Sequence, residues 1–126
     1  MILVDTSVWI DHLHKGVQEL AVKLDAGEVL AHPLVLGELA CGNVKNRAAV
    51  LSLLALLPCA VTATNDEVLA LIERQSLMGR GLGFIDAHLL ASAALTHECR
   101  LWTRDRRLRT VAESLELSYA ERRLSR

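Results

Sequence analysis

Four acidic side chains stand where the sequence of this 126-residue chain gives them no evident partner. Asp5 ends a short apolar run, and Glu38 is the only charged residue of an apolar helical segment. Asp86 opens an alanine-rich segment, and Asp105 follows a second apolar run. Taken one at a time, the aspartates are also explained as helix caps or turn residues, and Glu38 as the partner of an arginine.

Together, the four acids have the chemistry of a cation site. Four carboxylates that meet without matching bases repel one another. A divalent cation that prefers oxygen ligands, Mg²⁺ or Mn²⁺, removes that conflict. One such ion, or two ions about 4 Å apart, can activate water and hold a scissile phosphate. The set therefore predicts metal-dependent cleavage of a phosphodiester, with the number of ions left open.

The order of the elements brings at least two of these acids together. Short apolar runs alternate with helical patterns, which predicts an α/β fold: a three-layer α/β/α sandwich around a parallel sheet. The carboxyl ends of parallel strands share one edge, so we expect Asp5 and Asp105 to meet there. Glu38 is expected one helical turn after the second strand, whereas spacing does not determine the place of Asp86.

Four to five short strands are expected, near residues 2–4, 29–31, 60–63, 101–102 and 117–119. A first helix is expected to begin near Val8, and the others to span about 17–26, 34–41, 45–57, 64–78, 84–95 and 106–116. Thr64 and Glu67 have the spacing of a capping box at the start of one of them. The whole chain, residues 1–126, is expected to form a single domain.

Composition predicts a cytoplasmic protein without a membrane segment. Residues 1–11 carry two acids and no basic leader, which is unlike a signal peptide. The most apolar window, residues 48–57, is far shorter than the roughly 20 residues that span a bilayer. The three cysteines are widely spaced, as reduced structural thiols are.

The distribution of charge favours a polyanionic partner. Net charge is −1, but residues 100–126 hold eight arginines against four acids. Setting aside the four candidate acids leaves 11 acids against 14 basic residues in the whole chain. Contacts with backbone phosphates are therefore expected from Arg104, Arg106, Arg107 and Arg109. A solvated, arginine-rich helix face is the alternative.

Two other segments have no assigned role. The helix expected at 45–57 is apolar nearly all round, so it must be covered. We favour a partner surface for part of it, with packing in the monomer core as the alternative. The run Gly79-Arg-Gly-Leu-Gly83 matches neither the phosphate-binding P-loop nor the dinucleotide fingerprint, and a flexible turn is the better interpretation.

Four segments together resemble the PIN-domain ribonucleases, and most closely the VapC-type toxins of toxin–antitoxin modules. They cover residues 4–9, 34–39, 85–93 and 101–108, and they carry the four acids in the family's order. Each segment is a weak signal alone, whereas the ordered set is specific. The resemblance extends over essentially the whole chain.

The resemblance implies RNA cleavage that depends on Mg²⁺ or Mn²⁺, and a homodimer that a cognate antitoxin protein inhibits. By position, the metal ligands it implies are Asp5, Asp86 and Asp105, with Glu38 completing the catalytic set. Ser7 and Thr103 match hydroxyls that orient a carboxylate or a metal-bound water. Which RNA is cut stays open, because recognition of single-stranded RNA depends on shape and stacking.

Three other interpretations remain. The first is a PIN nuclease that is not a toxin. The second is a non-catalytic binding module whose acids bind metal only for stability. A phospho-receiver domain would need adjacent acids after the first strand and a lysine after the last. The only lysines are Lys15, Lys23 and Lys45, so this third interpretation is disfavoured.

Overall fold

The computed structural model describes residues 1–122 and builds them around a small parallel sheet. Its central strand, β1 (Ile2–Val4), pairs in parallel with β2 (Val29–Leu30) on one side and β3 (Arg100–Trp102) on the other. All three residues of β1 are buried, as a short apolar run predicts for a strand covered on both faces.

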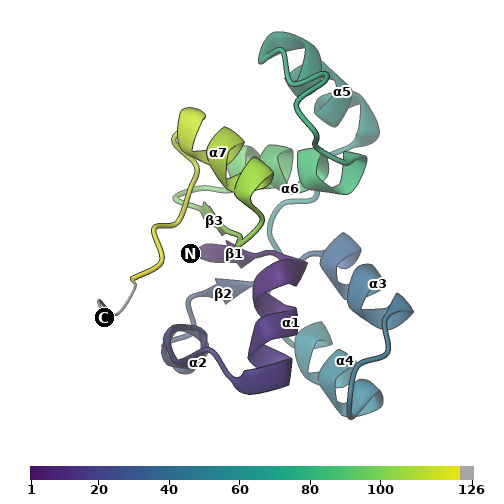
Figure 1. Cartoon of the computed structure of the whole chain (residues 1–126), viewed down its shortest axis with the longest axis vertical. Coiled ribbons are helices and arrows are strands. Elements are labelled where there is room, and N and C mark those ends of the chain that lie inside the picture. Colours follow the sequence, from purple (N-terminus) through teal and green to yellow (C-terminus); the bar gives the residue numbers. More distant parts are fainter. Residues whose placement is uncertain (123–126) are drawn as a thin grey trace.

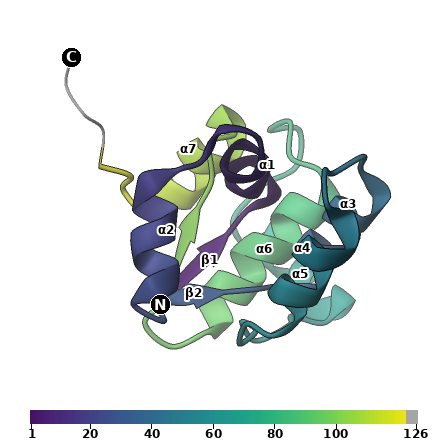
Figure 2. The ribbon, with the colours of Figure 1, turned by 90° about the horizontal axis from the view of Figure 1, so that it is seen from below.

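Helices cover both sides of this sheet. Figure 2 shows α2 on one side of the strands and α6 on the other, which confirms the three-layer α/β/α sandwich. In Figure 1, α5 and α4 lie at opposite ends of the long axis. Within residues 1–122 the helices are α1 (Thr6–Lys15), α2 (Gln18–Asp25), α3 (Pro33–Cys41), α4 (Arg47–Ala55), α5 (Asn65–Arg74), α6 (Phe84–Leu95) and α7 (Arg106–Ser114).

The expected strand number of four to five is wrong for the described residues, which contain three strands. Single parallel bridges, Ala31 to Cys59 and Leu101 to Ser118, stand where the two outer strands were expected. The first bridge does not lengthen into a strand, because the chain leaves the sheet after Ala31: His32 caps α3 and Pro33 begins it. Backbone N–H groups on the other side of the segment after Cys59 donate to hydroxyls. Thr96 Oγ1 accepts from the N–H of residue 61 at 2.9 Å, and Ser92 Oγ from that of residue 63 at 3.2 Å.

Local sequence explains several helix starts. The predicted capping box at α5 is present: Thr64 Oγ1 accepts from the Glu67 N–H, and Glu67 Oε1 accepts from the Thr64 N–H. Pro33 stands in the first turn of α3, where its missing N–H costs nothing. In α6, small alanines allow close packing, and seven consecutive residues from position 87 to 93 are buried.

The apolar helix α4 packs against the monomer core on one side only, through Leu54 and the partly buried Val50 and Leu51. Leu54 is its one fully buried residue. Leu53 is 60% exposed, and Leu56 at the end of the helix is 81% exposed. An apolar face of this kind is unusual for a surface that faces only water.

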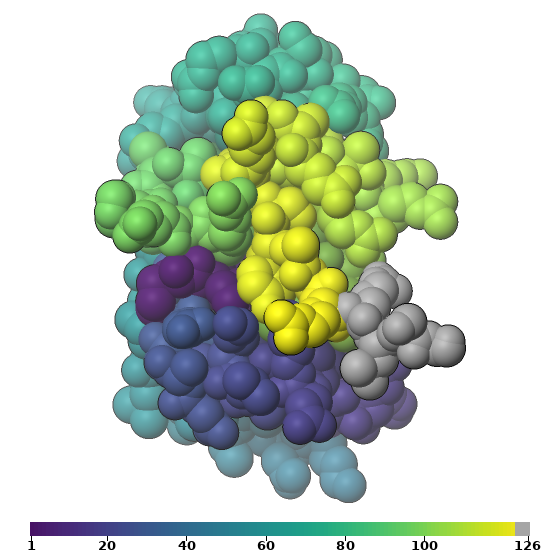
Figure 3. Space-filling view, turned by 90° about the vertical axis from the view of Figure 1, so that its left-hand side faces the viewer, coloured from purple at the N-terminus to yellow at the C-terminus, as the bar shows by residue number. Residues whose placement is uncertain are grey.

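The chain beyond α7 returns across the sheet edge to the N-terminal half. Figure 3 shows this segment running over the surface toward α2. Tyr119 Oη donates a hydrogen bond to Glu19 of α2, and the N–H of Arg122 donates to the same carboxylate at 2.9 Å. Across residues 1–122, no helix is both long and apolar enough to cross a bilayer.

Candidate active site

Asp5 is a buried carboxylate that two hydroxyls hold in place. It is 6% exposed and follows β1 directly. Its Oδ2 accepts hydrogen bonds from Ser7 Oγ and Thr103 Oγ1, both at 2.7 Å. The side chain makes no capping bond to α1, so the capping interpretation of Asp5 is wrong. Thr103 follows β3, which means that the ends of two neighbouring strands meet at Asp5.

The same two hydroxyls connect Asp5 to the segment that carries Asp105. Ser7 Oγ accepts from the Arg104 N–H at 3.0 Å, and Thr103 Oγ1 accepts from the Asp105 N–H at 3.0 Å. Each hydroxyl therefore donates to Asp5 and accepts from the backbone after β3. This arrangement fixes the orientation of the Asp5 carboxylate.

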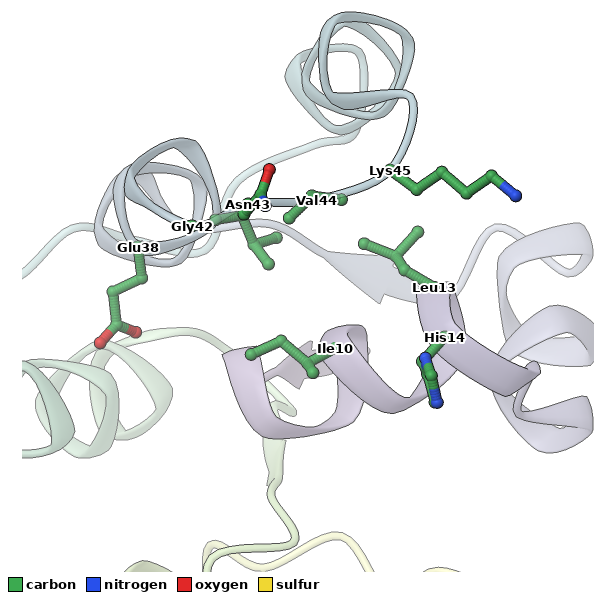
Figure 4. A pocket seen from close by; sticks show the side chains of 9 residues that line it. Ile10, Leu13, His14, Glu38, Gly42, Asn43, Val44 and Lys45 are labelled. Carbon is green, nitrogen blue, oxygen red and sulfur yellow. The ribbon is translucent and has the colours of Figure 1, made fainter.

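Glu38 reaches the site from α3 and is held by a hydroxyl that sequence reasoning missed. Thr6 Oγ1, in the first turn of α1, donates to Glu38 Oε1 at 2.6 Å. The signal available in the sequence was the position of Thr6 directly after Asp5, which gives the site a third hydroxyl besides Ser7 and Thr103. Glu38 also lies at one end of a groove of about 650 Å³ between α1 and the α3–α4 loop, lined along its length by Ile10, Leu13 and Lys45 among others (Figure 4).

A buried histidine starts the helix that carries Glu38. His32 Nδ1 accepts from the Leu34 N–H at 3.0 Å and so caps α3. Burial first, and then the charge of His88, lower the pKa of His32 to about 4. The ring is therefore neutral at pH 7, and its Nε2–H donates to Ser92 Oγ at 2.9 Å. No motif of the sequence singles out His32 as the cap of this helix.

Asp86 and Asp105 both cap the helices that they begin. Asp86 Oδ2 accepts from the Gly83 N–H at 3.0 Å, and Asp105 Oδ1 accepts from the Leu108 N–H at 3.1 Å. The structural interpretation is thus correct for these two residues, yet each cap uses only one carboxylate oxygen. A helix N-terminus also favours the negative charge that a second role would require.

All four acids share one property: one oxygen is engaged and the other is left open. Over the described part of the chain, the second oxygen of each carboxylate accepts no hydrogen bond. No lysine, arginine or histidine among these residues forms an ion pair with any of the four. The interpretation of Glu38 as the partner of an arginine is therefore wrong for residues 1–122.

The four charges act on one another through Asp86. Burial raises the pKa of Asp86, the hydrogen bond from the Gly83 N–H opposes this, and the charges of Asp5, Asp105 and Glu38 raise it further. Three acids are thus close enough to repel the fourth. The approach of Asp86 to the sheet edge, which spacing did not determine, is set by the tertiary fold.

Replacing Asp86 by asparagine is expected to stabilise the protein without divalent ions. An acid whose pKa is raised on folding favours the folded state only at low pH, and this contribution is lost as pH rises from about 4 through the raised pKa. Asp86→Asn removes the charge and retains an oxygen to cap α6. In EDTA at pH 7 we expect Tm to rise by a few degrees, and below about pH 4 to change little.

The control for this prediction is Asp66→Asn. Asp66 is an exposed acid in the first turn of α5, so its replacement removes a helix-terminal charge without relieving the cluster. Thermal unfolding followed by circular dichroism between pH 3.5 and 7 measures both variants. Equal gains in the two variants would contradict the repulsion among the four acids.

The chemistry of the donors fits a hard divalent cation. All the open atoms are carboxylate oxygens, the ligands that Mg²⁺ and Mn²⁺ prefer. As the side chains stand, no three histidine, cysteine or acidic residues of the described chain are grouped closely enough to hold an ion. Ion binding would therefore require these side chains to turn toward one another.

The arginines near the site differ in whether their guanidinium groups already form ion pairs within the protein. The Arg104 guanidinium pairs with Asp11 at 2.8 Å and with Glu121 at 2.6 Å, and these carboxylates raise its pKa. Its donors are thus engaged inside the protein. Arg106 and Arg107 are exposed on the first turn of α7 and remain the candidates for phosphate contacts.

Comparison with known proteins identifies the family of the chain. The model of the PIN domain family matches residues 2–114. Two relatives from Mycobacterium tuberculosis, of strains CDC 1551 / Oshkosh and ATCC 25618 / H37Rv, are named Ribonuclease VapC32. Each is 50% identical over 121 residues, which cover 96% of this chain and 98% of the relative. The phospho-receiver interpretation is excluded, and the chain belongs to the PIN-domain family, among its VapC ribonucleases.

Proposed function

We propose that this protein is the endoribonuclease toxin of a toxin–antitoxin module and hydrolyses RNA with Asp5, Glu38, Asp86 and Asp105. The observation that carries the proposal is that four carboxylates, three of which raise the pKa of the fourth, each keep one oxygen open and have no cationic partner among residues 1–122. The name of the two relatives supplies the substrate class, RNA. We further propose that the protein acts in the cytoplasm.

Mg²⁺ is the ion we propose, with Mn²⁺ as its substitute. Asp5, Asp86 and Asp105 would hold it, and when bound it would activate water and neutralise charge on the scissile phosphate. Ser7 and Thr103 keep Oδ2 of Asp5 occupied, so Oδ1 is the oxygen left for the ion. Thr6 likewise keeps Oε1 of Glu38 occupied and leaves Oε2.

A circular single-stranded RNA tests the reaction class. An endoribonuclease opens the circle in Mg²⁺ buffer, whereas an exonuclease leaves it intact. A non-catalytic module stabilised by metal would melt at a higher temperature with Mg²⁺ and cut neither the circle nor a linear RNA. That last outcome would refute the proposed function and support the binding module.

The hydroxyl of Thr103 is expected to matter through Asp5. Thr103→Val keeps the shape of this buried residue but removes a donor to Asp5 and an acceptor of the Asp105 N–H. Loss of a group that orients a metal ligand costs roughly 10- to 100-fold in metal affinity or activity. We expect a decrease of that size, with a higher Mg²⁺ concentration at half-maximal rate.

Two variants control this experiment. Thr103→Ser keeps a hydroxyl and should restore most of the activity. Thr110→Val removes an exposed hydroxyl of α7 that bonds only its own helix, at the Arg106 carbonyl, and should change nothing. A full-rate Thr103→Val enzyme with an unchanged Mg²⁺ requirement would show that this hydroxyl does not position Asp5.

We also propose that α4 contacts a partner, either a second copy of the chain or the antitoxin. Leu53 and Leu56 give this helix its exposed apolar face. Leu53→Glu is expected to lower the dimer fraction in light scattering or to weaken inhibition by the antitoxin at least tenfold. Leu69→Glu, at a leucine of α5 that is 53% exposed, is the matched control. A Leu53→Glu protein that stays dimeric and fully inhibited would rule out this role for α4.

A further inference from the structure

The glycine-rich loop at residues 79–83 packs against the side chain of Arg107. Gly81 has φ +80°, and a Cβ built on it would lie 2.7 Å from Cδ of Arg107, 3.0 Å from Nη1 and 3.1 Å from Nε. The aliphatic end and the guanidinium of Arg107 therefore rest on bare backbone. Gly79, with φ +73°, has no such neighbour within 4 Å.

The contact between Gly81 and Arg107 lies close in the chain to two of the four acids. Arg107 stands two positions after Asp105, which caps α7. Gly81 stands two positions before Gly83, whose N–H donates to Asp86. The Arg107 side chain thus crosses from the start of one acid-bearing helix to the loop that opens the other.

Arg107 is also chemically available. In residues 1–122 it forms no ion pair, in contrast to Arg104, whose guanidinium is held by two carboxylates. Arg107 is also exposed to solvent. A planar guanidinium binds phosphate oxygens through two parallel N–H bonds, and a side chain that is already positioned loses less entropy on binding.

We propose that Arg107, positioned by Gly81, binds a phosphate of the RNA beside the one that is cut. The inference rests on the proposed ribonuclease function and assigns a role to the glycine-rich loop. Gly81 is a positioning residue here: its backbone conformation and its missing Cβ together leave room for the guanidinium. Any side chain at position 81 would push Arg107 off the loop without touching the four acids.

The test compares cleavage kinetics of Arg107→Ala, Gly81→Ala and Gly79→Ala on one single-stranded RNA with saturating Mg²⁺. We expect Arg107→Ala to raise KM roughly tenfold or more with a much smaller change in kcat. The slope of log(kcat/KM) against log of salt concentration should become shallower by about 0.7, the value for one phosphate contact on a single strand.

Gly81→Ala should show the same KM and salt-slope defect while Arg107 is still present. Gly79→Ala places the same strain in the same loop and should be close to wild type. In the Arg107→Ala background, Gly81→Ala should add no further loss, because both changes remove one interaction. Arg107→Lys retains the charge and should recover part of the affinity.

The outcomes are distinguishable. Equal defects in Gly79→Ala and Gly81→Ala would mean that loop strain is the cause, and would overturn the inference. So would a wild-type KM and salt slope in Arg107→Ala, with the ribonuclease function left intact. A wild-type protein that cuts no RNA at all overturns the proposed function and, with it, this role of Arg107.

Discussion

Asp5→Asn should reduce RNA cleavage by roughly 10²- to 10³-fold, the rate equivalent of several kcal/mol of lost charge stabilisation. Asparagine has the shape of aspartate but only one oxygen. If that oxygen accepts from Ser7 and Thr103, as Oδ2 does now, an amide NH₂ replaces the open oxygen. If the amide turns over, the two hydroxyls lose their acceptor. Either way a charged oxygen is lost from the set of four acids.

Asp25→Asn is the control for this change, because Asp25 is an exposed aspartate of α2 outside the site. Circular dichroism should give both variants the native spectrum, so that a loss of rate reports on the site and not on folding. Cleavage by Asp5→Asn at the wild-type rate would remove Asp5 from the proposed mechanism.

Removal of divalent ions should abolish cleavage, and addition of Mg²⁺ or Mn²⁺ to the EDTA-treated protein should restore it. Four carboxylates without cationic partners among the described residues give a strong reason for this requirement. Ion binding should also stabilise the fold by about 2.7 kcal/mol when the ion is at 100 times its Kd. Thermal unfolding and RNA cleavage measured on the same ion titration check both effects.

The Asp86→Asn variant provides a cross-check on the metal requirement. It is expected to be more stable than wild type in EDTA and to gain less from Mg²⁺, because the repulsion that the ion relieves is already reduced. A wild-type protein that cuts RNA at full rate in excess EDTA would contradict the metal requirement. An equal gain of both proteins in Mg²⁺ would place the ion away from Asp86.

Local sequence was sufficient to predict the layered architecture and to select the four acids as candidate site residues. A three-residue apolar run followed by Asp5 specifies a buried strand that ends in a carboxylate, and the Thr64–Glu67 spacing specifies a helix start. These features depend on near neighbours in the chain, so periodicity and capping chemistry suffice to predict them. The alternation of elements then places the end of β1 next to the end of β3, which brings Asp5 to Thr103.

Only the tertiary structure decided the partners of those side chains. The choice of Thr6 as the donor to Glu38 depends on how α1 packs on α3, and the approach of Asp86 depends on how α6 returns to the sheet. The same holds for the ion pairs of Arg104 with two carboxylates and for the contact of Arg107 with the glycine-rich loop. These contacts join residues that are distant in the chain, and no periodic pattern encodes them.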